Sequence, residues 1–281
     1  MRNFRLLVLV WLILILTAVA KDSYAVPFKP GVYDPETGIS RITGLPIAKI
    51  ERPKGMDAPE PRHAAKLSGN YNCLILLIRY PDQGATQTSA SFVDMFNQDN
   101  YNGTGSINNY FREVSYGNFG VKGTVGAGSW YTSTNNRAYY GYASGPARAA
   151  ELVAQAVDAA EAAGVNFAPY DNNKDGKVDS LFIVHSGKGR EATGDGNDIH
   201  SHKWDLVSAG LGARNYDGVE INAYCIQPEL NSADNHIEIG VFCHEYGHLL
   251  GLPDLYDTTP EEPDSEGVGS FCLMGSGGWG G

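Results

Sequence analysis

Residues 244–254 read HEYGHLLGLPD, the pattern of a helix that ends in a glycine turn. His244 and His248 are four residues apart, so on a helix both imidazoles lie on the same face and can hold one zinc ion. Glu245 lies about 100° further round the helix, where it can reach a metal-bound water without binding the metal. Hydrolysis needs these roles, because zinc acidifies the water and a carboxylate takes its proton.

The surroundings of this motif indicate a buried helix. Two stray histidines on a surface helix would give the same HExxH pattern without any metal. Apolar residues, however, precede and follow the motif, and histidines in such a helix need polar partners, which a metal ion provides. The apolar residues are Ile237, Ile239, Val241, Phe242, Leu249, Leu250 and Leu252.

The third zinc ligand is expected just beyond the helix. Gly251 follows His248 by three residues, and Pro253 prevents further helix. A glycine lets the backbone take a left-handed turn, which would bring Asp254 under the two imidazoles.

A glutamate further along the chain is the competing third ligand. In the other large class of HExxH proteases, a glutamate on a following helix fills this role. The candidates here are Glu261, Glu262 and Glu266, but the intervening stretch TTPEEPDSEG is polar, rich in proline and unsuited to a helix. Asp254 is therefore the favoured ligand.

Length and charge limit the classes of function. The chain has 281 residues, enough for one large catalytic domain or two small ones with a sizeable core. It carries 32 acidic and 21 basic residues, a formal net charge of -11. An acidic chain repels phosphate backbones, so nucleic-acid binding is not expected, whereas acidity suits a protein that binds divalent cations.

Residues 1–25 have the pattern of a signal peptide. Arg2 and Arg5 precede an apolar run over 6–20, and the stretch 23–25 reads SYA, with a small residue at both key cleavage positions. The apolar run is shorter than the about 20 residues that a membrane span needs, although an uncleaved anchor is the alternative. We expect an exported protein, secreted to the extracellular space, with no membrane span after cleavage.

The rest of the chain divides into a lead-in and a domain. Residues 26–70 are rich in proline and glycine and predict an extended lead-in or a short propeptide. Residues 71–281 form the expected catalytic domain, with the final helix carrying HEYGH. Buried strands are predicted over 72–82, 177–187 and 219–230, helices over 89–98, 106–117 and 145–164, and a strand or hairpin over 118–133. Strands and helices interleave, so the fold class is α/β or α+β with a mixed sheet.

The spacing HExxHxxGxxD resembles the metzincin layout, with aspartate in place of the commoner third histidine. More narrowly, HEYGHLLGLPDLYD together with FCLMGSGGW at 271–279 is similar to the immune inhibitor A-like family of secreted metalloproteases. The resemblance extends upstream through NYFREVSYG, DNNKDGKVDSLFIVHSG and DIHSHKW, and covers about 70–281. It implies a zincin domain with a mixed twisted sheet, an active-site helix and a methionine turn at Met274. The implied activity is zinc-dependent hydrolysis of protein or peptide substrates.

The chain departs from this pattern at two places. Several metzincin groups have a tyrosine two residues after the turn methionine, where this chain has Ser276, so the oxyanion partner is unassigned and Tyr256 and His202 are the candidates. The chain also stops at Gly281, whereas relatives usually continue, so it is expected to be a truncated catalytic domain.

The stretch 171–179 resembles a calcium loop. Asp171, Asn173, Asp175 and Asp179 supply side-chain oxygens at the spacing of an EF-hand, and Lys177 would supply a backbone carbonyl. The acidic residue expected at the twelfth position is missing. An Asx-rich turn that needs no ion is the alternative, but alternating carboxylates repel one another, which favours Ca²⁺.

Four cysteines would meet an oxidising compartment, and sequence alone allows three pairings among Cys73, Cys225, Cys243 and Cys272. If the metzincin geometry holds, Cys243 and Cys272 flank the floor of the site, where a disulfide would brace it. The four remaining histidines of the domain are expected to have structural roles; they are His185, His200, His202 and His236.

These observations lead to a zinc endopeptidase in which His244, His248 and Asp254 bind the metal and Glu245 is the general base, with Gly251 and Met274 in support. The rival is a calcium-stabilised binding or adhesion module with a vestigial or structural zinc site. A closed structural site needs a fourth ligand, and Cys243 points about 100° away round the helix. An esterase is disfavoured because the chain has no G-x-S-x-G elbow.

Overall fold

The computed structural model describes residues 33–34, 39–40, 55–56, 67–257, 265 and 267–279. The predicted signal peptide, most of the predicted lead-in, and Glu261, Glu262 and Glu266 lie outside the described residues. Two short strands of the lead-in, β1 (Tyr33–Asp34) and β2 (Ile39–Ser40), form an antiparallel pair. Among the helices of the described part, none is both long enough and apolar enough to cross a membrane.

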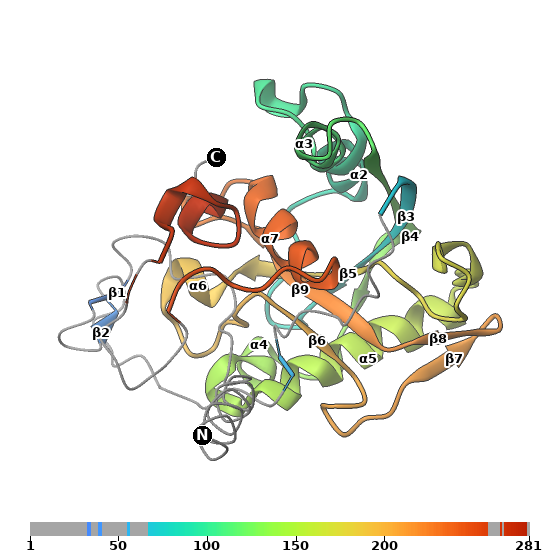
Figure 1. Cartoon of the computed structure of the whole chain (residues 1–281). Helices are drawn as coiled ribbons and strands as arrows, with labels where there is room; N and C mark the ends of the chain where they lie inside the picture. The colour runs from blue at the N-terminus through green and yellow to red at the C-terminus, as the bar shows by residue number, and fades with distance from the viewer. Residues whose placement is uncertain are drawn as a thin grey trace, which may run out of the picture.

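A five-stranded mixed sheet forms the centre of the domain, in the order β4-β3-β5-β9-β6 (Figure 1). Its first four strands are parallel, and β6 pairs antiparallel with β9 at the edge. This architecture confirms the predicted fold class, an α/β domain with a mixed sheet. The strands are β3 (Gly69–Arg79), β4 (Phe119–Thr132), β5 (Leu181–Lys188), β6 (His202–Asp205) and β9 (Ala223–Leu230), with β7 (Arg214–Tyr216) and β8 (Val219–Ile221) pairing separately.

Strand β3 has a continuous apolar run because helices cover both faces of the sheet. Leu74, Leu76 and Ile78 pack in one core with helix α5 (Pro146–Ala162). The alternate residues, Cys73, Ile75 and Leu77, pack in a second core with three other helices. These helices are α2 (Ser89–Asn97), α3 (Ile107–Val114) and α7 (Ile239–Leu249), and Figure 1 shows them on the side of the sheet opposite α5.

The predicted helix ends are confirmed. Ser106 caps α3, its hydroxyl accepting from the backbone N–H of Asn109 at 3.2 Å, and Gly117 follows the helix with φ 77°. Pro146 occupies the first turn of α5, and Gly164 follows its end with φ 80°. Shorter helices are α4 (Arg137–Tyr140), α6 (Arg190–Thr193), η1 (Tyr101–Gly103), η2 (Tyr142–Ser144), η3 (Ala168–Tyr170), η4 (Gly269–Phe271) and η5 (Ser276–Trp279).

Two expectations about strands needed refinement. The segment 118–133 is a single strand, not a hairpin, since β4 pairs with β3 on both sides of an irregularity between Ile75 and Leu77. At this irregularity Ala127 and Gly128 have positive φ, which bends the strand without reversing it. The segment 219–230, predicted as one strand, contains both β8 and β9.

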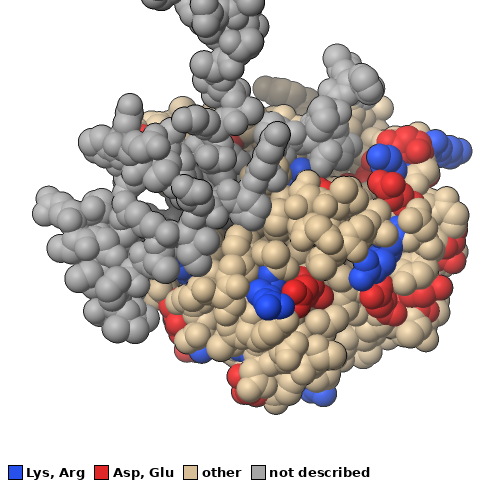
Figure 2. Space-filling model, turned by 90° about the horizontal axis from the view of Figure 1, so that it is seen from below, with Lys and Arg blue, Asp and Glu red and all other residues tan. Residues whose placement is uncertain are grey.

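Charged side chains on the face shown in Figure 2 are mixed in sign. Lysine and arginine residues lie beside acidic residues on the described part of that face, where no continuous basic patch is visible. Among the described residues, oppositely charged side chains form ion pairs, such as Arg214 with Asp158 at 2.8 Å and Lys177 with Glu220 at 3.4 Å.

Helix α5 supplies a test of the core. Leu152 is fully buried against the sheet, so Leu152→Ala should lower the free energy of unfolding by about 2–5 kcal/mol, measured from urea unfolding midpoints. The control is Glu161→Ala on the same helix, which should change stability by less than about 0.5 kcal/mol. Equal effects of the two variants would contradict the assignment of this face to the core.

Candidate metal centre

Helix α7 carries the HEYGH motif through the core of the domain. All of its residues from 241 to 249 are buried, as the flanking apolar residues predicted. The Tyr246 hydroxyl lies 2.8 Å from Ser180 Oγ, and its ring packs against Phe182 and Phe111 with centroids 5.2 and 5.3 Å apart. These contacts fix the rotation of the helix against the sheet.

Backbone carbonyls orient both histidines of the motif. Nδ1 of His244 lies 2.8 Å from the Leu273 carbonyl oxygen, and Nδ1 of His248 lies 2.9 Å from that of Leu252. A carbonyl can only accept, so each Nδ1 carries the proton that it donates. In a neutral imidazole this leaves the lone pair on Nε2, the arrangement found in metal-binding histidines.

The turn after α7 brings Asp254 to these nitrogens. Gly251 has φ 93°, a left-handed conformation that a side chain would strain, and its N–H bonds the His248 carbonyl at 3.1 Å. Asp254 Oδ1 then lies 3.1 Å from Nε2 of His244 and 3.4 Å from Nε2 of His248. The structure therefore brings together the three residues that the sequence singled out.

The chemistry of this cluster fits a bound cation. Nε2 of His244 and both carboxylate oxygens of Asp254 are buried and make no regular hydrogen bond with other described residues. Oxygen and nitrogen lone pairs that face each other at 3.1 Å repel unless a positive charge lies between them. Two imidazole nitrogens and one carboxylate oxygen lie within 4.8 Å of one another, a combination of donor atoms that could hold a divalent metal ion such as zinc.

Electrostatics keep the aspartate in its ligating form. Burial alone would raise the pKa of the Asp254 carboxyl, but where protonated imidazoles of His244 and His248 supply the positive charge in place of a metal ion, their hydrogen bonds and charge outweigh burial and hold that pKa below its ordinary value. The side chain is therefore a carboxylate at neutral pH.

Met274 lies directly beneath the helix. Its Sδ is 2.6 Å from the position that a Cβ would take on Gly247, so any side chain at residue 247 would force the Met274 side chain to move. The Met274 carbonyl accepts from the Leu255 N–H at 2.8 Å, and the preceding Leu273 carbonyl holds His244. The turn thus connects the histidine to the segment that carries Asp254.

Gly247 and the two orienting carbonyls were not identified from the sequence. A glycine inside an otherwise apolar helix was the available signal for Gly247, since it weakens a helix unless close packing requires it. The carbonyls of Leu252 and Leu273 have no signal in the sequence, because every residue has a carbonyl. Glu245, the predicted base, is fully buried on the same helix.

His202 is not placed to act at this centre. It shares a face of β6 with Trp204, which belongs to the α5 core, so its ring lies on the side of the sheet away from α7. Its Nδ1 lies 2.8 Å from the His200 carbonyl oxygen, and its Nε2 lies 3.4 Å from the Tyr224 hydroxyl. Tyr256 is then the remaining candidate for stabilising the oxyanion. It is half-buried and lies two residues after Asp254.

The remaining histidines have structural surroundings. His185 is buried beside Tyr80, and burial lowers its pKa to about 4. His236 lies 3.1 Å from Ser91 Oγ and packs on Phe92. Within the described ranges, the only converging group of three or more His, Cys, Asp or Glu ligands is His244, His248 and Asp254.

The expected disulfide between Cys243 and Cys272 is absent, and both residues are thiols. Cys243 lies on α7 and packs in the apolar core. Cys272 is half-buried and lies on the methionine turn. Burial raises the pKa of the Cys243 thiol well above its ordinary value, as expected for a thiol in an apolar core.

The predicted calcium loop is compact and internally hydrogen-bonded. Asp171 accepts from the N–H groups of Asp175 at 3.1 Å and Gly176 at 3.0 Å, and Asp179 accepts from the Asn172 N–H at 2.7 Å. The Asn173 amide donates to Asp179 at 2.9 Å.

Such bonds occur in Asx turns and also within occupied calcium loops. The Lys177 N–H bonds Asp175 Oδ1 at 3.1 Å, and the loop is tied to β8 where the Glu220 N–H bonds the Gly176 carbonyl at 2.8 Å. The loop therefore has a defined shape, with its side-chain oxygens held by hydrogen bonds within the loop.

Known proteins resemble this chain over the same region. The family model of the immune inhibitor A peptidase M6 catalytic domain matches residues 86–281. Immune inhibitor A of Bacillus thuringiensis subsp. alesti is 29% identical over 296 residues, an alignment that covers 85% of this chain and 42% of that protein. The pre-pro-metalloprotease PrtV of Vibrio cholerae serotype O1 (strain M66-2) is 34% identical over 205 residues, covering 63% of this chain and 21% of that protein.

The chain thus spans less than half the length of these curated relatives. The matched region nevertheless includes α7, Asp254 and the methionine turn, the parts that form the candidate metal centre. From this match and the architecture around it, the chain belongs to the immune inhibitor A family of M6 peptidases.

Proposed function

We propose that this chain is an exported, zinc-dependent endopeptidase that hydrolyses peptide bonds in proteins or peptides. The observation that carries the proposal is the buried convergence of His244 Nε2, His248 Nε2 and Asp254 Oδ1. Membership of a peptidase family supports it, as do the printed names of the relatives, one of which is a metalloprotease.

In this proposal a residue of the chain, Glu245, transfers the proton of the attacking water. Zinc, when bound, supplies a Lewis acid that polarises a carbonyl and raises the acidity of water. Glu245 accepts the proton of the attacking water at its carboxylate and passes it to the leaving amine. The carbonyls of Leu252 and Leu273 keep both imidazoles in the tautomer that leaves Nε2 for the metal.

Export is part of the same proposal. The basic, apolar and small-residue pattern of 1–25 supports a cleaved signal peptide. The printed name of PrtV describes that relative as a pre-pro-metalloprotease, which supports a removable lead-in over 26–70 followed by a catalytic domain over 71–281. The proposed location is extracellular.

We also propose that Ca²⁺ binds the loop 171–179, with a structural role. Asp171, Asn173, Asp175 and Asp179 offer side-chain oxygens, and Lys177 offers a backbone carbonyl. The support is the oxygen-rich composition at EF-hand spacing and the defined shape of the loop. A calcium-stabilised binding module with a vestigial zinc site is the rival, and the buried ligand cluster argues against it.

Glu245→Gln separates metal binding from proton transfer. The variant should keep about one zinc per chain and lose at least about 100-fold in casein hydrolysis, because only the general base is removed. Zinc content by plasma mass spectrometry and initial rates would be compared with those of Glu113→Gln, an exposed acid on α3 that should behave as wild type. Full activity of the Glu245 variant would refute the mechanism.

Asp254→Ala identifies the third ligand. The variant should lose both zinc and chelator-sensitive hydrolysis, since two imidazoles alone bind zinc weakly. Equilibrium dialysis against zinc would measure the binding, with Asp257→Ala from the same segment as the control. If the Asp254 variant retains zinc, the ligand is elsewhere, and Glu261, Glu262 and Glu266 become the residues to substitute.

Calcium binding should appear as thermal stabilisation. Saturating Ca²⁺ should raise the Tm of the wild-type chain by about 5–10 °C over a sample with a calcium chelator. Asp171→Ala should abolish this difference, whereas Asp158→Ala, an exposed acid on α5, should preserve it. An identical Tm in both conditions for wild type would identify the loop as an Asx turn that needs no ion.

A further inference from the structure

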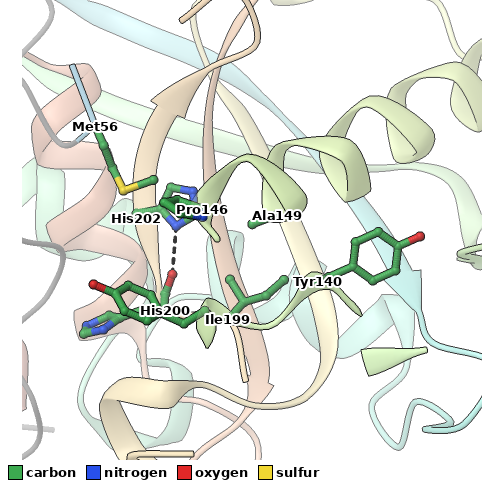
Figure 3. A pocket seen from close by; sticks show the side chains of 8 residues that line it. Met56, Tyr140, Pro146, Ala149, Ile199, His200 and His202 are labelled. Carbon is green, nitrogen blue, oxygen red and sulfur yellow. Dashed lines mark hydrogen bonds between the residues drawn. The ribbon is translucent and has the colours of Figure 1, made fainter. Parts of the chain in front are cut away.

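A small apolar pocket lies on the α5 side of the sheet, away from α7. Its walls include Tyr142 of η2, Ala149 of α5, and Ile199 and His202 at the start of the β6 region. Met56, from the lead-in, reaches into it beside His202 (Figure 3). The cavity left around the methionine measures about 10 Å³, roughly the room of one water molecule, so no other ligand fits beside it.

Met56 is the apolar anchor of a polar stretch. Residues 51–63 read ERPKGMDAPEPRH. Met56 is the only large apolar side chain in this stretch, and charged residues lie near it in the sequence on both sides. Its side chain is nevertheless only 4% exposed and belongs to the α5 core. The preceding Gly55 has φ 85°, a conformation that favours glycine, and a Cβ at this position would lie 3.8 Å from Ser208 Oγ, so the backbone passes near Ser208.

The walls of the pocket are held in place independently of the methionine. The guanidinium of Arg190 lies 3.9 Å from the centroid of the Tyr142 ring, and its Nη1 lies 3.4 Å from His200 Nδ1. His202 is fixed by the His200 carbonyl and the Tyr224 hydroxyl. Because these polar groups are engaged with one another, the surface offered to Met56 is apolar and aromatic, which suits a polarizable thioether.

We infer that this pocket is the binding site by which the domain holds its own lead-in, with Met56 as the anchoring side chain. The pocket binds an unbranched apolar side chain, that of Met56, which belongs to the otherwise polar stretch 51–63. It lies on the face of the sheet opposite the metal centre, so attachment of the lead-in here is independent of zinc binding. The inference does not rest on the proposed peptidase activity.

Limited proteolysis of the full chain tests the anchor. Trypsin cleaves after Lys54, next to the anchored Gly55 and Met56, and cleavage of a docked segment requires its release. Met56→Asp should accelerate cleavage of the Lys54–Gly55 bond at least about tenfold, the effect expected from losing a buried methionine contact. Met56→Leu, which refills the pocket, should stay within about threefold of wild type.

Three controls separate anchoring from other effects. Val114→Asp adds a charge at an exposed position of α3, on the opposite face of the sheet from the pocket, and should leave the cleavage rate unchanged. The Tm of the domain and its zinc content should match wild type in Met56→Asp. Equal cleavage rates for Met56→Asp and wild type, in a folded chain, would overturn the inference.

Methionine oxidation gives a second readout without any substitution. In the native chain Met56 should react with hydrogen peroxide at least about tenfold more slowly than in the chain unfolded in guanidinium, measured by peptide mass mapping. Met95 and Met274, which are buried in the domain, serve as internal references for the folded state. Oxidation of Met56 at the unfolded rate while both references stay protected would equally refute the anchor.

Discussion

The contact on which the site depends is the 3.1 Å approach of Asp254 Oδ1 to His244 Nε2 inside the protein. Two lone pairs face each other there, away from water, and the arrangement is unfavourable unless a cation joins them. The surrounding structure holds them together in spite of this. Both imidazoles are fixed from behind by carbonyls, and the aspartate is fixed by a glycine turn and by the hydrogen bond between Leu255 and Met274.

This arrangement explains why the methionine turn lies where it does. The turn places a carbonyl behind His244, a second carbonyl behind the Asp254 segment, and a thioether against Gly247. The methionine turn thereby supports both His244 on α7 and the segment that carries Asp254. Along the chain, these two elements are joined by the turn at Gly251. Methionine suits this position because its flexible, polarizable side chain fills an irregular gap beneath a helix.

The sheet separates two kinds of contact. The face covered by α2, α3 and α7 carries the candidate metal centre, and the contact between Tyr246 and Ser180 holds α7 on that face. The face covered by α5 carries the Met56 pocket. The parallel strands are buried on both sides, and alternate residues of β3 point into different cores. The sheet is therefore a rigid layer between the two faces.

The sequence by itself determined much of this protein. Periodicity and capping residues located α3 and α5, the continuous apolar runs located β3 and β5, and the HExxHxxGxxD spacing identified the three residues that the structure brings together. These features are local, because a helical turn, a glycine turn and a buried strand are each encoded by neighbouring residues.

Only the tertiary structure decided the rest. The side of the sheet on which His202 lies depends on the pairing of β6 with β9, which excludes it from the centre. Cys243 and Cys272 are both free thiols, and Cys243 packs in the apolar core on which α7 lies. The carbonyls behind the histidines and the pocket around Met56 join residues far apart in the chain, and such contacts follow from packing, which no local pattern encodes.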